Sequence, residues 1–263
     1  MADCRKFPAP TAEWFANRND SKMNSKTLAG LVATTALLAA AGSASGQNWS
    51  DNFDSYTVGS IQGQGGWEGW TGNAAAAGTV TTAQSSSAPK SLQIVRGNDT
   101  VKTFSGVNSG VWTFSMQQYI PSSAAGKSWV ILMNQYPSNL DWSEQLEVDI
   151  TGGSVKSDNG FASASVPLVK DAWITLRFDI DLTAGSVSSF YNTTLMSTHD
   201  WHDATGINAL RALDLYADED VAGGTAQVGS VYYDNFTLVP EPTSASLLLL
   251  GGLALLLRPR KQA

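Results

Sequence analysis

Two carboxylates on one predicted strand are the residues of this chain best placed for acid–base chemistry. Glu147 and Asp149 stand at alternate positions of residues 145–150, and alternate positions of a β-strand share one face of a sheet. Retaining glycoside hydrolysis uses two carboxyl groups about 5 Å apart, one as nucleophile and one as proton donor. The next position on that face is Thr151, which cannot protonate a leaving group. The nearest other carboxylate, Glu144, has the opposite parity, so the pair indicates a solvated or sugar-binding face and not a hydrolase.

Aromatic side chains in turn-rich segments are the candidates for contact with a glycan. Sugar rings stack on exposed aromatic faces that the hydrophobic core does not use. Trp67 and Trp70 lie in one Gly-rich segment, and Tyr136 and Trp142 lie in another turn-rich segment. We expect these four residues to form a glycan site, while Trp67 and Trp70 could equally plug one end of the fold. The tryptophans within strand-like runs are expected in the core: Trp112, Trp129 and Trp173.

Both histidines of the chain fall in one short segment with two carboxylates. His199 and His202 alternate there with Asp200 and Asp203, a set that could bind Zn²⁺ or Ni²⁺. Histidines three residues apart converge only on a helical turn, and this segment is rich in turn residues, so a surface loop is the favoured interpretation. The sequence has no Gly-x-Ser-x-Gly elbow and no phosphate-binding loop, which leaves nucleotide-dependent chemistry without residues to perform it.

Short strands separated by turns must position these residues. Apolar, β-branched and aromatic residues mixed with period-two polarity predict strands, and Gly, Asn, Asp and Ser clusters between them predict turns. The predicted strands cover residues 91–96, 111–116, 129–133, 145–150, 173–180, 213–216 and 231–238. No segment carries a sustained helical stripe. The pattern predicts an all-β fold, a two-sheet antiparallel sandwich.

The two ends of the predicted sandwich repeat one triplet. Asp-Asn-Phe occurs at residues 51–53 and again at 234–236, which predicts that the first and last strands pair within one sheet. Together with the Gly-Gln-Gly-Gly-Trp turn at 63–67 and the strand series, these ends resemble the concanavalin A-like lectin and glucanase jelly roll. The resemblance covers about 190 residues and depends on strand order more than on a signature.

The jelly-roll resemblance implies two kinds of site. Laminarinase-type hydrolases of that fold carry Glu-x-Asp-x-Glu on a concave strand, and Glu147 and Asp149 resemble its first two members, while the last Glu, the proton donor, is missing. Such domains also often hold a structural Ca²⁺ where the first and last strands meet. On that resemblance Asp51, Asp54 and Asp234 are candidate Ca²⁺ ligands; the alternative is that they start turns and bond to the backbone.

The N-terminal end has the order of a secretory signal peptide. Lys22 and Lys26 flank an apolar run, residues 28–41, which small residues at 42–46 follow. We expect residues 23–46 to be the signal peptide, with Met23 the true first residue and residues 1–22 an upstream extension. That start would also remove Cys4, the only cysteine, so the exported domain would have no thiol chemistry.

The C-terminal end, residues 239–263, resembles the PEP-CTERM sorting signal. Pro240, Glu241 and Pro242 are followed by the apolar run 243–257, and Arg258, Arg260 and Lys261 form a basic cluster. Fifteen helical residues span about 22 Å, short of the roughly 30 Å hydrocarbon core. The resemblance implies recognition by a membrane-embedded exosortase, cleavage near the Pro-Glu-Pro element and release at the cell surface. A membrane anchor that is never cut is the alternative.

Charge and length limit what the middle of the chain, residues 47–239, can do. It is long enough for one sizeable domain, and the whole chain carries 23 acidic against 16 basic residues, a net charge of −7. Such acidity argues against nucleic acid as a partner. We therefore expect an exported sandwich, passed through the secretion machinery and briefly held in the inner membrane, that binds polysaccharide without cleaving it. The alternatives are a matrix component without a defined ligand and, less favoured, a laminarinase-type hydrolase.

Overall fold

The computed structural model describes residues 48–158, 163–218 and 225–241. The predicted signal peptide, Pro242, Arg258, Arg260 and Lys261 lie outside these residues. Within the described ranges, no helix is both long enough and apolar enough to cross a membrane.

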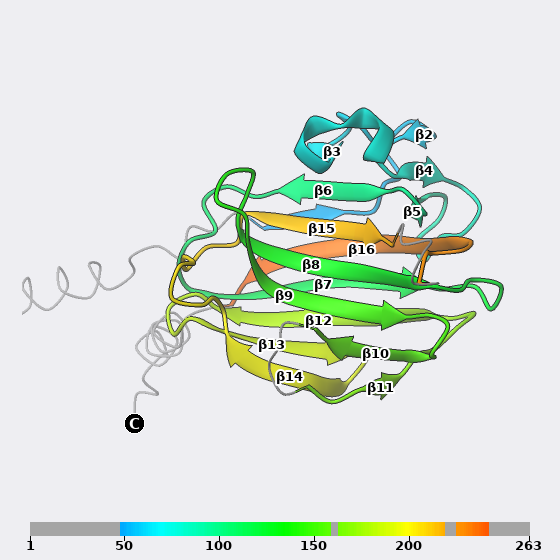
Figure 1. The fold of residues 1–263 in the computed structure, drawn as a ribbon. Helices are drawn as coiled ribbons and strands as arrows, with labels where there is room; N and C mark the ends of the chain where they lie inside the picture. The colour runs from blue at the N-terminus through cyan, green and yellow to red at the C-terminus, as the bar shows by residue number, and fades with distance from the viewer. Residues whose placement is uncertain (1–47, 159–162, 219–224, 242–263) are drawn as a thin grey trace, which may run out of the picture. The chain divides into compact units, whose positions relative to one another are not determined.

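The described residues form two antiparallel sheets that lie one on the other (Figure 1). The nine-stranded sheet contains, in spatial order, β14 (Thr194–Asp200), β13 (Ser186–Tyr191), β12 (Trp173–Asp181), β7 (Val111–Tyr119), β16 (Ser230–Pro240), β5 (Ser91–Val95), β4 (Thr79–Thr81) and β2 (Gly59–Ser60), with β1 (Trp49–Asp51) also paired to β16. The seven-stranded sheet contains β11 (Val166–Pro167), β10 (Ser154–Ser157), β9 (Asp141–Asp149), β8 (Lys127–Gln135), β15 (Ala212–Ala217), β6 (Asp99–Thr103) and β3 (Trp67–Gly69). Two short 3-10 turns, η1 (Trp70–Gly72) and η2 (Ala74–Ala76), follow β3. The predicted all-β, two-sheet antiparallel sandwich is confirmed.

Alternation of side chains explains why these segments are strands with one buried face. In β12 the even-numbered residues Ile174, Leu176, Phe178 and Ile180 are buried, and the odd-numbered residues between them are partly exposed. The buried faces of both sheets meet in one apolar core. Because each strand presents its other face outward, the parity of a residue decides whether it supports the core or is available to a ligand.

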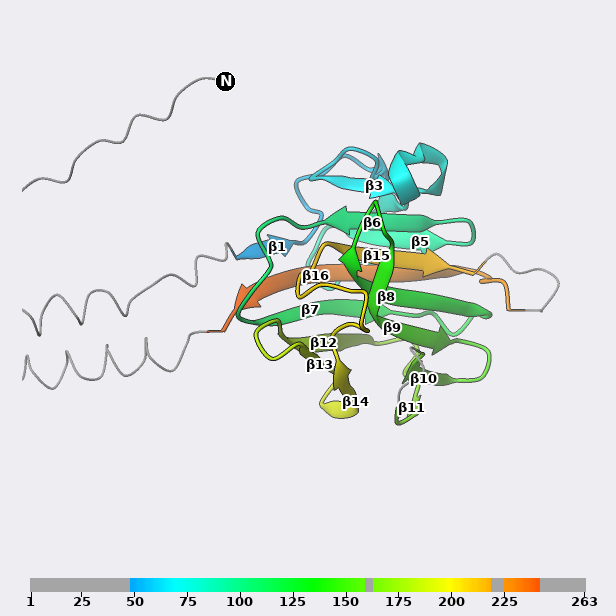
Figure 2. The same ribbon diagram turned by 60° about the vertical axis from the view of Figure 1, so that its left-hand side comes forward.

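The first and last strands pair as the repeated triplet predicts. β1 lies antiparallel to β16, with Trp49 opposite Leu238 and Asp51 opposite Phe236. Figure 2 shows β1 alongside β16. The last strand extends to Pro240, and the Glu241 amide donates to the Val111 carbonyl oxygen at 2.8 Å. The first two residues of the Pro-Glu-Pro element therefore continue the sheet.

All seven predicted strand segments are strands, but the hairpin of β13 and β14 was not predicted. Its sequence is rich in Ser and Thr, and these residues pair across the hairpin, for example Ser189 with Ser197 at 2.6 Å between the hydroxyl oxygens. His199 belongs to β14 and is buried. The expected surface loop at this histidine is therefore wrong, because a strand turns the side chain inward.

Candidate functional site

The outer face of the seven-stranded sheet carries the predicted carboxylates. Glu147 and Asp149 of β9 both point outward, opposite the odd-numbered residues of β8. Glu147 pairs with Lys127 at 3.1 Å and with Lys156 at 3.6 Å. The Asp149 carboxylate accepts a 2.6 Å hydrogen bond from the Gly152 amide. Lysine side chains therefore pair with Glu147, and a backbone amide bonds to Asp149.

Glu144 faces the interior, as its parity predicts. It is fully buried, accepts from the Ser157 hydroxyl at 2.7 Å and contacts His199 Nε2 at 2.6 Å. The other ring nitrogen, Nδ1, lies 2.8 Å from the Asp200 carbonyl oxygen, which can only accept a hydrogen bond. Burial lowers the pKa of His199, but the hydrogen bond and charge of Glu144 outweigh burial and raise this pKa above its ordinary value. The pair is therefore a buried imidazolium–carboxylate contact.

Trp67 is a core residue and cannot stack against a ligand, which corrects the sequence prediction. It is completely buried, its Nε1 donates to Asp51 Oδ2 at 2.9 Å, and its ring packs edge-on against Phe236. In the register of β3 with β6, Trp67 lies opposite Lys102 and turns inward, whereas its neighbour Glu68 turns outward. The alternative interpretation, a tryptophan that plugs the fold, is the one that its burial supports.

Trp70 and Tyr136, far apart in sequence, meet on the outer face. Their ring centroids are 5.2 Å apart at an interplanar angle of 64°. The Thr71 amide donates to the Tyr136 hydroxyl at 2.8 Å, and that hydroxyl donates to Glu68 at 3.5 Å. Burial raises the pKa of Tyr136, and the charges of Glu68 and Asp214 raise it further. Both carboxylates therefore lie near this hydroxyl.

A second aromatic pair on the same face was missed from the sequence. Trp129 of β8 lies opposite Tyr216 of β15, with ring centroids 5.6 Å apart and 34° between the planes. Both side chains are partly exposed, so the expected core placement of Trp129 is wrong. The same expectation is wrong for Trp173, which is partly exposed opposite Tyr119 on the other sheet. Residues 129–133 are a continuous apolar run without alternation, so no sequence signal assigned Trp129 to a face.

Two aspartates lie between the aromatic pairs and were also missed. Asp214 of β15 lies opposite Val101 and Ile131, and Asp99 of β6 lies opposite Tyr216. Asp214 is only 3% exposed; burial raises its pKa well above the ordinary value, and the hydrogen bond and charge of Asp99 raise it further. Two like charges in contact favour one shared proton. Asp214 Oδ1 has no hydrogen-bond partner among the described residues.

We call this surface the aromatic face. It comprises Trp70, Tyr136, Trp129, Tyr216, Glu68, Asp99 and Asp214. A small apolar cluster of buried residues supports it from the sheet: Val101, Ile131, Met133 and Ala212. Figure 1 looks onto this side of the molecule, where β8 and β15 cross the middle of the sheet. The face combines rings that can stack on sugars with carboxyl groups that can bond hydroxyl or amino groups.

Trp142 lies on the same sheet but away from these pairs. It stands opposite Met133 near the start of β9 and is 41% exposed. With Asp141, His202 and Asp203 it lines a hollow of about 310 Å³. Trp142 therefore remains available for contact with a long ligand.

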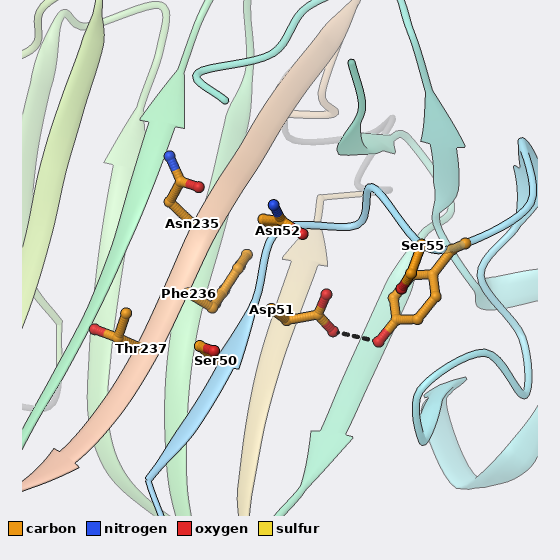
Figure 3. A pocket seen from close by; sticks show the side chains of 8 residues that line it. Ser50, Asp51, Asn52, Ser55, Asn235, Phe236 and Thr237 are labelled. Atoms are coloured by element: carbon orange, nitrogen blue, oxygen red, sulfur yellow. Dashed lines mark hydrogen bonds between the residues drawn. The ribbon is translucent and has the colours of Figure 1, made fainter. Parts of the chain in front are cut away.

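The three predicted Ca²⁺ ligands are occupied by the chain's own donors. Asp51 accepts from the Phe53 amide at 3.0 Å, from Tyr56 Oη at 2.6 Å and from Trp67. Asp54 accepts from the Lys90 amide, and Asp234 accepts from the amides of residues 86 and 87. Figure 3 shows Asp51 beside Phe236 at the β1–β16 pair, with a dashed line for its hydrogen bond. These residues line a pocket of about 570 Å³. The turn-starting alternative therefore describes these aspartates better than the Ca²⁺ site.

Metal binding by the histidine segment has no geometric support either. His199 points into the core against Glu144, whereas His202 lines the hollow beside Trp142. Across residues 48–158, 163–218 and 225–241, no group of three His, Cys, Asp or Glu side chains is placed to hold a metal ion.

Comparisons with known proteins support the fold alone. No protein-family model matches this sequence, and a search of curated proteins finds no relative. Among solved structures, a sialidase aligns with a TM-score of 0.50 and 11% identity, over 75% of this chain and 19% of the sialidase. Galectin LEC-6 of Caenorhabditis elegans aligns at 14% identity over 56% of this chain and 95% of its own (TM-score 0.36). The family 7 alginate lyase AlgAT5 aligns at 13% identity over 57% and 76% (TM-score 0.39). This chain thus corresponds to about a fifth of the sialidase's length.

Proposed function

We propose that this chain is an exported carbohydrate-binding protein that holds polysaccharide on the aromatic face. One observation supports this most: the outer sheet face presents two ring pairs, Trp129 with Tyr216 and Trp70 with Tyr136, on either side of carboxyl groups. Aromatic rings gathered around a buried carboxyl group, Asp214, on one outer face are not needed for solubility alone and are typical of an interaction surface.

In this proposal the chain binds polysaccharide and does not cleave it. Glu147 pairs with two lysines, Asp149 caps a turn, and Thr151 stands where the glucanase pattern requires a proton donor. Both carboxylates are engaged by the chain's own lysines and backbone, and neither stands at the position of the proton donor. The sandwich is, in this proposal, a concanavalin A-like jelly roll whose outer sheet face serves as a lectin surface.

The proposal also includes export and sorting, which the two ends of the chain would direct. A signal peptide at residues 23–46 would send the sandwich outward, and the PEP-CTERM-like segment at 239–263 would deliver it to an exosortase at the membrane. Cleavage near Pro-Glu-Pro would then release the sandwich at the cell surface. Cutting there would remove about 2 to 3 kDa, the mass of a segment of that length.

A glycan array with the purified chain tests the binding function. The decisive variants are Trp129→Ala, within the aromatic face, and Trp173→Ala, the matched control on the outer face of the other sheet. Trp173 also packs against a tyrosine, with 5.5 Å between its ring centroid and that of Tyr119. We expect only Trp129→Ala to lose binding. Equal loss in both variants would refute the aromatic face as the binding site. No binding by the wild type would leave a matrix component without a defined ligand.

A further inference from the structure

Two hollows adjoin at one end of the seven-stranded sheet, and Asp141 lines both of them. The first has a volume of about 310 Å³, and Trp142 and His202 are among the residues that line it. The second has a volume of about 440 Å³, and its lining includes Leu140 and Thr205. Small-molecule sites in proteins typically measure about 300–1,000 Å³. This end of the sheet therefore has room for a ligand beside an exposed tryptophan.

The hollows lie on the same outer face as the aromatic face. Strands β8 and β9 run side by side (Figure 1), and Trp142 lies opposite Met133, which belongs to the apolar cluster beneath the aromatic face. Trp129 stands four residues before Met133 on β8, which is about 13 Å along the strand. Residues an even number apart on a strand share a face. A long ligand can therefore pass from Trp129 to Trp142 without leaving that face.

The segment 202–206 supplies one side of both hollows, and hydrogen bonds and close packing fix its position. The Asp203 carboxylate accepts from the amide and the hydroxyl of Thr205, both at 2.7 Å. These bonds hold the pKa of Asp203 below its ordinary value. Gly206 packs so closely on β9 that a Cβ there would lie 2.5 Å from Asp141 Oδ2. The hollows are thus preformed, and a preformed site avoids part of the ordering cost of binding.

The lining of the first hollow combines an aromatic ring with hydrogen-bond acceptors. His202 Nδ1 contacts the Asp203 carbonyl oxygen, which can only accept, so Nε2 is the acceptor of the neutral ring. The carboxylates of Asp141, Asp200 and Asp203 are further acceptors. A sugar offers the matching groups, hydroxyl donors around an apolar ring face that can stack on Trp142. A uronate would instead bring negative charge next to these carboxylates.

On these grounds, and resting on the proposed function, we infer that the hollows beside Trp142 form a second sugar subsite for an uncharged polysaccharide. A sugar ring would lie against Trp142, and its hydroxyl groups would donate to Asp141 and His202. Another part of the same polysaccharide would lie against Trp129 on the aromatic face. Two linked contacts raise the affinity for long chains above that for short ones, because the second contact forms within the same complex.

Titration calorimetry with short and long probes tests the second subsite. The probes are the dimers and hexamers of β-1,4-linked glucose and of N-acetylglucosamine, together with a mannuronate hexamer. We expect a neutral hexamer to bind at least about tenfold more tightly than its dimer, since only the hexamer can contact Trp129 and Trp142 together. The mannuronate hexamer should bind at least about tenfold more weakly than that neutral hexamer.

Trp142→Ala removes the ring of the second subsite. This variant should bind the neutral hexamer about tenfold more weakly, so that most of the difference between hexamer and dimer disappears. Its resistance to urea should stay close to that of the wild type, because Trp142 is 41% exposed. His202→Ala should weaken hexamer binding in the same direction. Trp173→Ala, on the outer face of the other sheet, is the matched control and should change neither affinity.

The outcomes separate the second subsite from the proposed function. If Trp129→Ala weakens hexamer binding and Trp142→Ala does not, the second subsite is wrong while carbohydrate binding at the aromatic face stands. Equal affinities for dimer and hexamer, or a mannuronate hexamer that binds as tightly as the neutral ones, would also overturn the inference. If no probe binds, both proposals fail.

Discussion

The buried contact between Glu144 and His199 gives the sharpest prediction about stability. The side chains are 0% and 2% exposed, and 2.6 Å separates Glu144 Oε2 from His199 Nε2. Removing one partner of a buried ion pair costs about 3–5 kcal/mol. Glu144→Gln keeps the shape of the side chain and a partner for Ser157, so we expect a smaller loss, about 1.5–3 kcal/mol, the range for hydrogen bonds to charged groups.

This contact also predicts how stability depends on pH. The folded pKa of His199 is raised above its unfolded value of about 6.5. The contribution is therefore complete below pH of about 6.5 and is lost as pH rises through the folded pKa. The free energy of unfolding of the wild type should fall over that window, and Glu144→Gln should flatten the fall.

Urea unfolding at several pH values between 5.5 and 9 measures both effects. The control is Asp179→Asn, on the outer face of the other sheet, whose ion pair with Arg177 has both side chains about 40% exposed. Ion pairs of that kind contribute about 0–1 kcal/mol, so this control should shift the midpoint only slightly. Equal stabilities for the two variants, or the same pH slope in wild type and Glu144→Gln, would refute a charged, buried His199–Glu144 pair.

Three further predictions concern the ends of the sandwich and the aromatic face. Asp51→Asn should destabilise the domain by about 1–3 kcal/mol in urea unfolding, because the donors of Phe53, Tyr56 and Trp67 share this carboxylate. EDTA should leave the thermal midpoint unchanged, and a clear fall would restore the Ca²⁺ hypothesis. Purified chain should show no turnover of β-glucans; turnover abolished by Glu147→Gln would contradict binding without cleavage.

Much of the fold could be predicted because its signals are local. Turn residues and alternating polarity marked seven strands, and the repeated Asp-Asn-Phe triplet indicated that β1 and β16 pair. The hairpin of β13 and β14 lacked such a signal, because its Ser and Thr residues gain partners only when the two strands are side by side. Strand pairing supplies this information, and strand pairing is not local.

The site was less predictable because strand register and residue parity determine which side chains meet on the outer face. Asp99 and Asp214 are more than a hundred positions apart in sequence, and only the pairing of β6 with β15 brings them into contact. Trp129 stands in an unbroken apolar run, so its outward orientation follows from its neighbours across the sheet. Trp67 shows the reverse: its Gly-rich context suggested exposure, but the carboxylate of Asp51 holds it in the core.

A crystal structure of the chain soaked with an oligosaccharide that the array identifies is the most direct test of ligand binding at the aromatic face. We expect sugar density against Trp129 and Tyr216, with an amino or hydroxyl group within hydrogen-bond distance of Asp214. Density over the Tyr119–Trp173 pair of the other sheet, with the aromatic face empty, would contradict that assignment.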